Sequence, residues 1–145
     1  MKSLLIKTVE YRDEIAAIKH IRTKVFQSEQ GVSAELEFDG LDDAAVHLLA
    51  YLDDRAVGTA RIRNIDDITA KIERLAVLPE ARKRGIGKKL MASALETISA
   101  QNKSQVIVHA QEYIAQLYRQ LGFEVIGARF TEAGIAHVKM LAQLS

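Results

Sequence analysis

The sequence predicts a mixed α/β (α+β) fold in which helices flank one central, mostly antiparallel sheet. Seven segments show the alternating or short continuous apolar runs that are typical of strands. Three others place apolar residues every three or four positions, which indicates amphipathic helices. The two kinds of segment are interspersed without a linker or a repeat, so we expect a single domain spanning residues 1–145.

The first half of the chain supplies a strand, a helix and a hairpin. Residues 2–9 alternate in polarity and predict an edge strand or a second strand, and residues 12–26 carry isoleucine and valine at helical spacing. Residues 27–43 are polar and acidic, so we expect a long loop that forms a wall or lid of a substrate site. The runs 45–52 and 56–63 flank a short polar turn and predict a hairpin.

The second half alternates strands and helices and closes with another hairpin. The first strand ends at the only proline of the chain, and the second helix is expected to stop at Gly122. Ala133-Gly134 is the expected turn of the closing hairpin. The expected elements are a strand at 71–78, a helix at 86–102, a strand at 105–110, a helix at 113–121, and hairpin strands at 123–129 and 135–141.

A basic turn with two glycines joins the strand at 71–78 to the following helix; it reads Arg82-Lys83-Arg84-Gly85-Ile86-Gly87-Lys88. The first N–H groups of a helix have no intrahelical acceptor, and the helix dipole is positive at this end. Glycine lets the backbone approach a ligand without an intervening Cβ atom. These features predict a site for a phosphate-like anion.

The spacing in this turn excludes two common nucleotide-binding motifs. A P-loop needs glycine at Arg82 and a hydroxyl residue at Lys89, and a dinucleotide fingerprint needs a third glycine at Leu90. The remaining pattern, Arg-x-x-Gly-x-Gly after a strand, resembles the acetyl-CoA loop of the GNAT N-acetyltransferase superfamily. The element order resembles the GNAT fold over essentially the whole chain. Local resemblances lie at 117–123 and, to a small bacterial branch similar to glyphosate-acetylating relatives, at 22–30, 39–47 and 132–138.

The resemblance implies acetyl-CoA as co-substrate and a sheet that is splayed between its fourth and fifth strands. The pantetheine arm would pair with the freed edge of the fourth strand, where a backbone N–H would polarise the thioester carbonyl. The alternative for this part of the strand is a packing role, although side chains can pack while the backbone binds. The residues expected to bind the cofactor are Leu75, Ala76, Val77, Arg82, Lys83, Arg84, Gly85, Ile86, Gly87, Lys88 and Tyr118.

Two side chains are candidates for proton transfer. Tyr118 lies at a helix end before Gly122-Phe123, and a phenol with a pKa of about 10 can protonate a departing thiolate. His137 resembles the base of glyphosate-acetylating relatives, and an imidazole suits removal of an amine proton at neutral pH. Packing at a helix end is the alternative role for Tyr118, and a hydrogen-bonded core position is the alternative for His137. The roles of His109 and His47 stay open.

Arg22, Arg74 and Gln111 are the residues expected to bind the acceptor. Arginine would favour an acidic group on the acceptor, whereas the acidic residues between 35 and 43 would favour a cationic amine. Since these charges point to different ligands, the identity of the acceptor stays open.

Composition limits the partners of the protein. Apolar residues make up 48% and charged residues 27%, as in a globular protein, and the net charge of +1 argues against broad nucleic-acid binding. No apolar run is long enough to cross a bilayer, and no signal-peptide pattern is present. With the absence of cysteine, these features lead us to expect a cytoplasmic protein.

Without cysteine no protein thiol can carry the acetyl group. We therefore expect direct transfer, in a ternary complex and without a metal, to a primary or secondary amine of a small molecule. Two other functions stay open: a non-catalytic acyl-CoA-binding or regulatory module, and acetylation of a protein lysine or N-terminus. The length of the acyl group also stays open, and exposed sheet edges are compatible with a homodimer.

Overall fold

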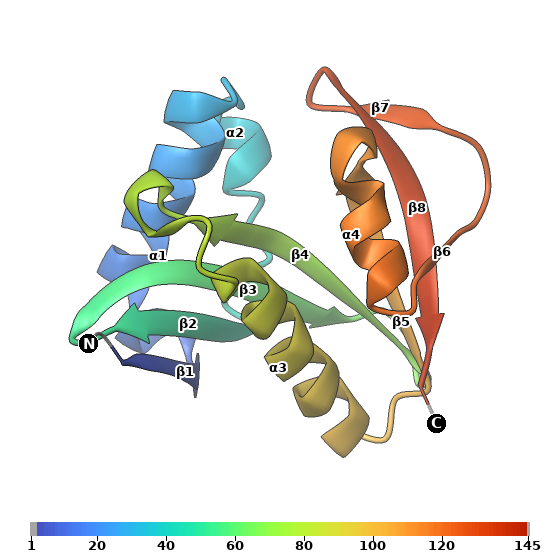
Figure 1. Cartoon of the computed structure of the whole chain (residues 1–145), viewed down its shortest axis with the longest axis horizontal. Coiled ribbons are helices and arrows are strands. Elements are labelled where there is room, and N and C mark those ends of the chain that lie inside the picture. Colours follow the sequence, from blue (N-terminus) through green and yellow to red (C-terminus); the bar gives the residue numbers. More distant parts are fainter. Residues whose placement is uncertain (1–2, 145) are drawn as a thin grey trace.

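The computed structural model describes residues 3–144, which form one eight-stranded sheet with helices packed against it (Figure 1). Residues 1, 2 and 145 of the expected domain, and with them the start of the first predicted strand, lie outside this range. The elements are β1 (Leu4–Val9), α1 (Ile15–Arg22), α2 (Ala34–Glu37), β2 (Val46–Leu52), β3 (Arg55–Asn64), β4 (Thr69–Val77), α3 (Ile86–Ala100), β5 (Gln105–Gln111), α4 (Ala115–Gln120), β6 (Glu124–Val125), β7 (Phe130–Glu132) and β8 (Ile135–Gln143).

The sheet order is β1-β2-β3-β4-β5-β8-β6, with β7 paired to β8. Strands β1 to β4 form an antiparallel meander, so the predicted edge strand and first hairpin are confirmed. Strands β4 and β5 are parallel, because α3 carries the chain back across the sheet between them.

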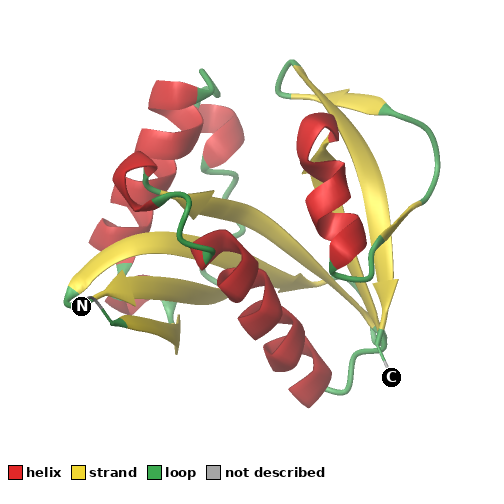
Figure 2. Cartoon of the chain, viewed as in Figure 1, coloured by secondary structure: helices red, strands yellow, loops and turns green. Residues whose placement is uncertain are grey.

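The pairing between β4 and β5 covers only three residue pairs, Thr69 to Lys71 with Gln105 to Ile107. Beyond these pairs the two strands diverge, and the sheet opens into a V (Figure 2). The expected splay between the fourth and fifth strands is therefore confirmed. It leaves the β5-facing edge of β4 without a strand partner from Ile72 onward.

Helices cover both faces of the β1–β4 half of the sheet. Residues 57–62 of β3 are buried without a break, which requires cover on each side. Helix α3 lies on one face and α1 with α2 on the other (Figure 1). The apolar stripe of α3 is the one that its 3.6-residue period predicts: Ile86, Leu90, Met91, Ala94 and Ile98 are buried.

The segment predicted as a long loop from residue 27 contains more helix than expected. The first helix is α-helical over Ile15–Arg22 and continues with π-helical geometry over Thr23–Glu29. A second short helix, α2, follows, and the side chain of Ser33 caps its N-terminus by accepting a hydrogen bond from the Leu36 N–H. This segment is therefore partly helical and is not a continuous loop.

The closing hairpin has the predicted turn but a different first strand. Ala133 and Gly134 have φ angles of 52° and 78°, the left-handed pair that a tight hairpin turn requires. The predicted strand at 123–129 is wrong in extent, because β6 ends at Val125 and Gly127 turns the chain with a φ of 77°. The turn joins β7 to β8 instead.

The longest helix, α3, has 15 residues. Among residues 3–144, none of the helices combines the length and the apolarity that crossing a bilayer demands.

Candidate active site

The opening between β4 and β5 continues into a cavity of about 1040 Å³. Its lining comes from both diverging strands, from the start of α3, from α4 and the turn before it, from the β7–β8 hairpin and from the segment between α1 and β2. Most of the residues predicted for the site lie in this lining: Arg74, Leu75, Ala76, Val77, Arg82, Lys83, Gly85, Ile86, Gly87, Lys88, Gln111, Tyr118 and His137.

The N-terminus of α3 opens onto the cavity. The Lys89 N–H donates to the Gly85 carbonyl at 3.1 Å, so the N–H groups of residues 86–88 precede it and have no acceptor within the helix. Gly85 has a φ of 74°, and a Cβ atom there would meet no protein atom within 4 Å. The backbone at this helix start is therefore open to an anion.

The basic side chains of this turn differ in what they contact. Arg82 is held by the carboxylate of Glu29, at 2.8 and 2.5 Å, and its Nε donates to the Val77 carbonyl at 3.0 Å. Lys83 and Lys88 line the cavity, whereas Arg84 lies outside its lining. The side chain of Arg84 is therefore not brought to the predicted cofactor site.

Strand β4 has a bulge where it leaves β5. Thr59 of β3 pairs with Ala76, but Arg61 pairs with Glu73, so a single residue opposes two on β4. One of these two is Arg74, with a φ of 56°, a conformation that is uncommon outside glycine. The bulge places the side chains of Glu73 and Arg74 on the same face of the sheet: Glu73 contacts Arg61, and both Arg61 and Arg74 contact Asp39.

Tyr118 is fixed at the end of α4 by a Schellman cap. The N–H groups of Gly122 and Phe123 donate to the carbonyls of Arg119 and Tyr118 at 3.1 Å, and Gly122 has a φ of 97°. The Phe123 ring packs edge-on against the Tyr118 ring at 5.8 Å. Burial, with a smaller effect of Tyr113, raises the pKa of Tyr118 to about 12, so its phenol stays protonated at neutral pH. The Gly122-Phe123 sequence thus positions Tyr118 at the cavity.

His137 lies in β8, the strand that pairs with β5, and is 6% exposed. Its Nδ1 is 2.7 Å from the Ile135 carbonyl oxygen. A carbonyl only accepts, so Nδ1 carries a hydrogen, and the neutral ring has its lone pair on Nε2. His137 therefore has the hydrogen bond expected of the core alternative, and it also lines the cavity, where a base would have to lie.

Glu132 lies between two imidazoles, a contact that sequence reasoning missed. Its Oε1 accepts a hydrogen bond from His109 Nδ1 at 3.2 Å, and its Oε2 lies 3.7 Å from His137 Nε2. The Phe130 ring lies between the two imidazoles, with centroids at 5.0 and 5.8 Å. The hydrogen bond from His109 lowers the pKa of Glu132 although partial burial opposes this. Its sequence signals were its place just before the Ala133-Gly134 turn and within the segment 132–138 that resembles a small bacterial branch.

The structure contradicts the prediction that Arg22 binds the acceptor. Its side chain is fully buried, does not line the cavity, and binds the carboxylates of Glu37 and Asp42, the latter at 2.6 Å. A guanidinium buried in this way requires local counter-charges, and the acidic segment around α2 provides them. Arg22 therefore joins α1 to this segment and does not face the acceptor pocket.

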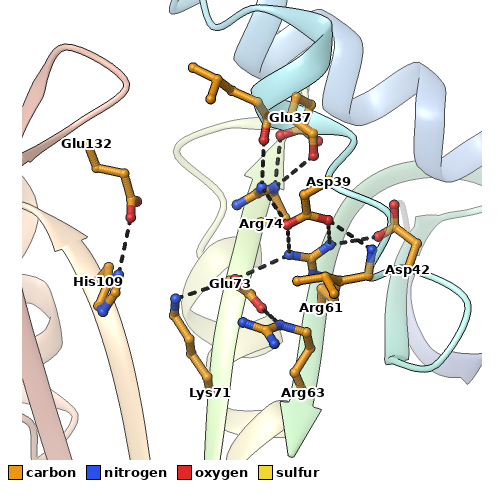
Figure 3. Close-up of polar contacts among 12 residues, drawn as sticks. Glu37, Asp39, Asp42, Arg61, Arg63, Lys71, Glu73, Arg74, His109 and Glu132 are labelled. Atoms are coloured by element: carbon orange, nitrogen blue, oxygen red, sulfur yellow. Dashed lines mark hydrogen bonds and ion pairs between the residues drawn. The ribbon is translucent and has the colours of Figure 1, made fainter. Parts of the chain in front are cut away.

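Arg74 and Gln111 line the cavity but already have protein partners. Arg74 donates to the carbonyls of Leu36 and Glu37, and its Nε lies 2.9 Å from Glu37 Oε2 (Figure 3). Gln111 donates to the side chain of Gln30 at 3.0 Å. Its partner places Gln111 on the α1–α2 face of the opening, and His109, two residues earlier in β5, shares that face.

His47 is buried outside the cavity. Its Nε2 lies 3.0 Å from the Asp42 carbonyl oxygen, and burial lowers the pKa of the ring. These contacts assign His47 to the packing between β2 and the acidic segment.

Comparisons with known proteins agree with this geometry. The family model described as an acetyltransferase (GNAT) domain matches residues 9–144. The uncharacterized N-acetyltransferase YjcF of Bacillus subtilis is 31% identical over 142 residues, which cover 97% of this chain and 99% of the relative. An acyl-CoA N-acyltransferase structure from Pseudomonas aeruginosa is 28% identical, with a TM-score of 0.86 and coverage of 97% and 99%. A GNAT family acetyltransferase from Elizabethkingia anophelis with acetyl-CoA bound has the same fold, at 15% identity, a TM-score of 0.73 and coverage of 97% and 98%.

Proposed function

The chain belongs to the GNAT acetyltransferase family and is an N-acetyltransferase, and from this premise we propose that it transfers acetyl from acetyl-CoA directly to a primary or secondary amine of a small molecule. The observation that carries the proposal is the shared cavity of the open α3 N-terminus and the free edge of β4. The first suits a diphosphate and the second suits an extended amide chain, and acetyl-CoA contains both.

The cofactor would be held by backbone and charge together. The N–H groups of Ile86, Gly87 and Lys88 would bind the pyrophosphate, and the ammonium groups of Lys83 and Lys88 would add charge. Arg82 would support this turn, since its guanidinium joins Val77 to Glu29. Residues 75–77 would bind the pantetheine arm through their backbone, and an N–H at the bulge would polarise the thioester carbonyl. A structure of the same fold has acetyl-CoA bound, which supports acetyl-CoA as the ligand of this cavity.

The acid and the base would act from different elements. The acceptor, in its ammonium form, gives one proton to Nε2 of His137. Its nitrogen lone pair then forms a bond to the thioester carbon, the C–S bond breaks, and the Tyr118 hydroxyl protonates the leaving thiolate. The nitrogen loses its second proton to solvent as the amide forms, the phenolate takes a proton from solvent, and the His137 imidazolium returns its proton to solvent. One proton is released per acetyl group transferred.

The test is thiol release from acetyl-CoA with a panel of small amines, together with calorimetric binding of CoA. We expect saturable thiol release and double-reciprocal lines that intersect when both substrates are varied. Parallel lines, or an isolable acetyl-protein, would contradict direct transfer. CoA binding without release with any amine would favour a non-catalytic acyl-CoA-binding module. Preference for a peptide amine over every small amine would favour a protein acetyltransferase, and propionyl-CoA would test the length of the acyl group.

A further inference from the structure

The α1–α2 face of the cavity is densely charged, and its arginines are already neutralised. The Arg61 guanidinium contacts Asp39 at 2.8 Å, Asp42 at 3.1 Å and Glu73 at 3.2 Å (Figure 3). Arg74 is bound by Glu37 and Asp39. An anionic acceptor would have to displace a bound carboxylate to reach either guanidinium, so these arginines do not provide a ready anion site.

Each carboxylate that lines the cavity, with one exception, is bound by arginine. Glu29 is bound by Arg82, Glu37 and Asp39 by Arg74, and Glu73 by Arg61 and Arg63. Within residues 3–144 the exception is Glu132, whose ionic contacts are with His109 and His137 alone. Its side chain is 47% exposed, so a ligand can reach it. An imidazole in its neutral form does not compensate the negative charge of Glu132, and no arginine or lysine of the described residues lies within ion-pair distance of this carboxylate.

The hydrogen-bonding pattern around Glu132 leaves a place for a donor. The Ile135 carbonyl fixes the hydrogen of His137 on Nδ1, so Nε2 of the neutral ring is an acceptor. Glu132 Oε2 is also an acceptor, and the two atoms lie 3.7 Å apart. Two facing acceptors are stabilised by a group that donates to both. An ammonium ion has the required N–H groups and the charge opposite to that of Glu132.

A metal ion is a poorer occupant than an ammonium ion. In the part of the chain that the structure describes, no group of three or more histidine, cysteine, aspartate or glutamate side chains is placed to hold a metal ion. His109 Nδ1 donates its hydrogen to Glu132, so that nitrogen has no lone pair with which to bind a metal ion.

Building on the proposed function, we propose that Glu132 binds the acceptor as an ammonium ion beside Nε2 of His137, and that the acceptors are alkylamines or diamines without a neighbouring carboxylate or phosphate. Glu132 would then be a specificity-determining residue of the acceptor site. The ammonium ion held there donates one hydrogen to the carboxylate and another to His137 Nε2, the atom that takes its proton in the proposed reaction.

The first test is a matched acceptor series: pentylamine, 1,5-diaminopentane and 5-aminopentanoate, which differ only at the end remote from the reacting amine. We expect kcat/KM for pentylamine and 1,5-diaminopentane to exceed that for 5-aminopentanoate by at least about tenfold, since the remote carboxylate of this zwitterion would be repelled by Glu132. Equal or better use of 5-aminopentanoate overturns the inference alone. Failure of every amine, with CoA binding intact, overturns the proposed function and this inference with it.

The second test is Glu132→Gln, with Glu124→Gln as the control; Glu124 is exposed in β6 and outside the cavity lining. For Glu132→Gln we expect KM for pentylamine to rise at least about tenfold, with a smaller change in kcat and an unchanged Kd for acetyl-CoA. Adding pentylamine to the CoA complex should shift the imidazole resonances of His109 and His137 in the wild type and in Glu124→Gln, but not in Glu132→Gln. An unchanged KM, or the same shifts in Glu132→Gln, contradicts the inference.

Discussion

Tyr118 shows how one side chain is prepared by its surroundings. The Schellman cap fixes its backbone, Phe123 fixes its ring, and burial raises its pKa to about 12. A phenol in this state is protonated at any physiological pH. It is therefore available as a proton donor, although a high pKa makes it a weak acid.

Replacing Tyr118 with phenylalanine removes only the hydroxyl group. We expect kcat to fall by about 100-fold, the lower range for general acid catalysis, while the Kd for acetyl-CoA changes little. Tyr51→Phe is the control, because Tyr51 lies outside the cavity and bonds to Glu14. The steady-state rate of thiol release gives kcat, and calorimetry gives the Kd. An unchanged kcat would assign Tyr118 to packing alone.

The partners of Arg22 and Arg74 could not be predicted from the sequence. A resemblance could point to Arg22 and Arg74, but not to the carboxylates that they meet. Those partners come from the segment between α1 and β2, residues remote in the sequence, and only the folded chain brings them together. The contact of Glu132 with His109 was likewise not predictable, because the two residues are 23 positions apart and nothing local in the sequence indicates that they meet.

At the scale of elements, the sequence predicted those helix ends that depend on the backbone conformation of a single residue. The α3 N-terminus, with its left-handed Gly85, and the α4 end at Gly122 were readable because glycine at these positions has a backbone reason. The break between β6 and β7 was not predicted. The apolar residues of this segment fit one continuous strand, and the break depends on how the segment pairs with β8. The π-helical extension to Glu29 has no sequence signal that we can name.

The open start of α3 can be tested by placing a negative charge in it. Gly85→Glu should raise the Kd for CoA by at least about tenfold, because the carboxylate would compete with the pyrophosphate for the helix N-terminus. Gly127→Glu is a matched control: its φ of 77° is close to the 74° of Gly85, and a Cβ atom there also meets no protein atom within 4 Å. Gly127 lies outside the cavity lining.

Both variants share the strain of a left-handed residue, about 1–2 kcal/mol, so their melting temperatures should fall together. Only the Gly85 variant should lose affinity in a calorimetric titration with CoA. Equal affinities in the two variants would show that the helix start is not the anion site.

At the scale of the whole molecule, both proposed proton-transfer groups belong to the half of the sheet beyond the splay, which is formed by β5, β8 and β6. Tyr118 comes from α4, packed against β5, and His137 from β8. The first half of the sheet supplies the free edge of β4 and the acidic wall. The buried ion pairs of Arg61 hold that wall to β3, and those of Arg22 hold it to α1. The stability of the fold therefore depends in part on these buried charges.

This dependence predicts how stability responds to acid. Arg61 holds the pKa of Asp39 well below its usual range; for Asp42 and Glu73, burial acts to raise the pKa, but Arg22 and Arg63 lower it overall. The stabilisation from such groups is present above their unfolded pKa of about 4 and is lost as the pH falls. Glu37 acts in the opposite direction, since burial raises its pKa, and it offsets part of this loss.

His47 should extend the loss of stability to higher pH. Burial lowers its pKa, so its neutral form stabilises the fold above the unfolded value of about 6.5, and that stabilisation falls with the pH. We expect the melting temperature to decline gently below about pH 6.5 and steeply below about pH 4. His47→Gln should remove the gentle decline, while His20→Gln, an exposed histidine on α1, should keep it. A gentle decline of the same size in His47→Gln as in the wild type would contradict this account, because the variant lacks the buried imidazole.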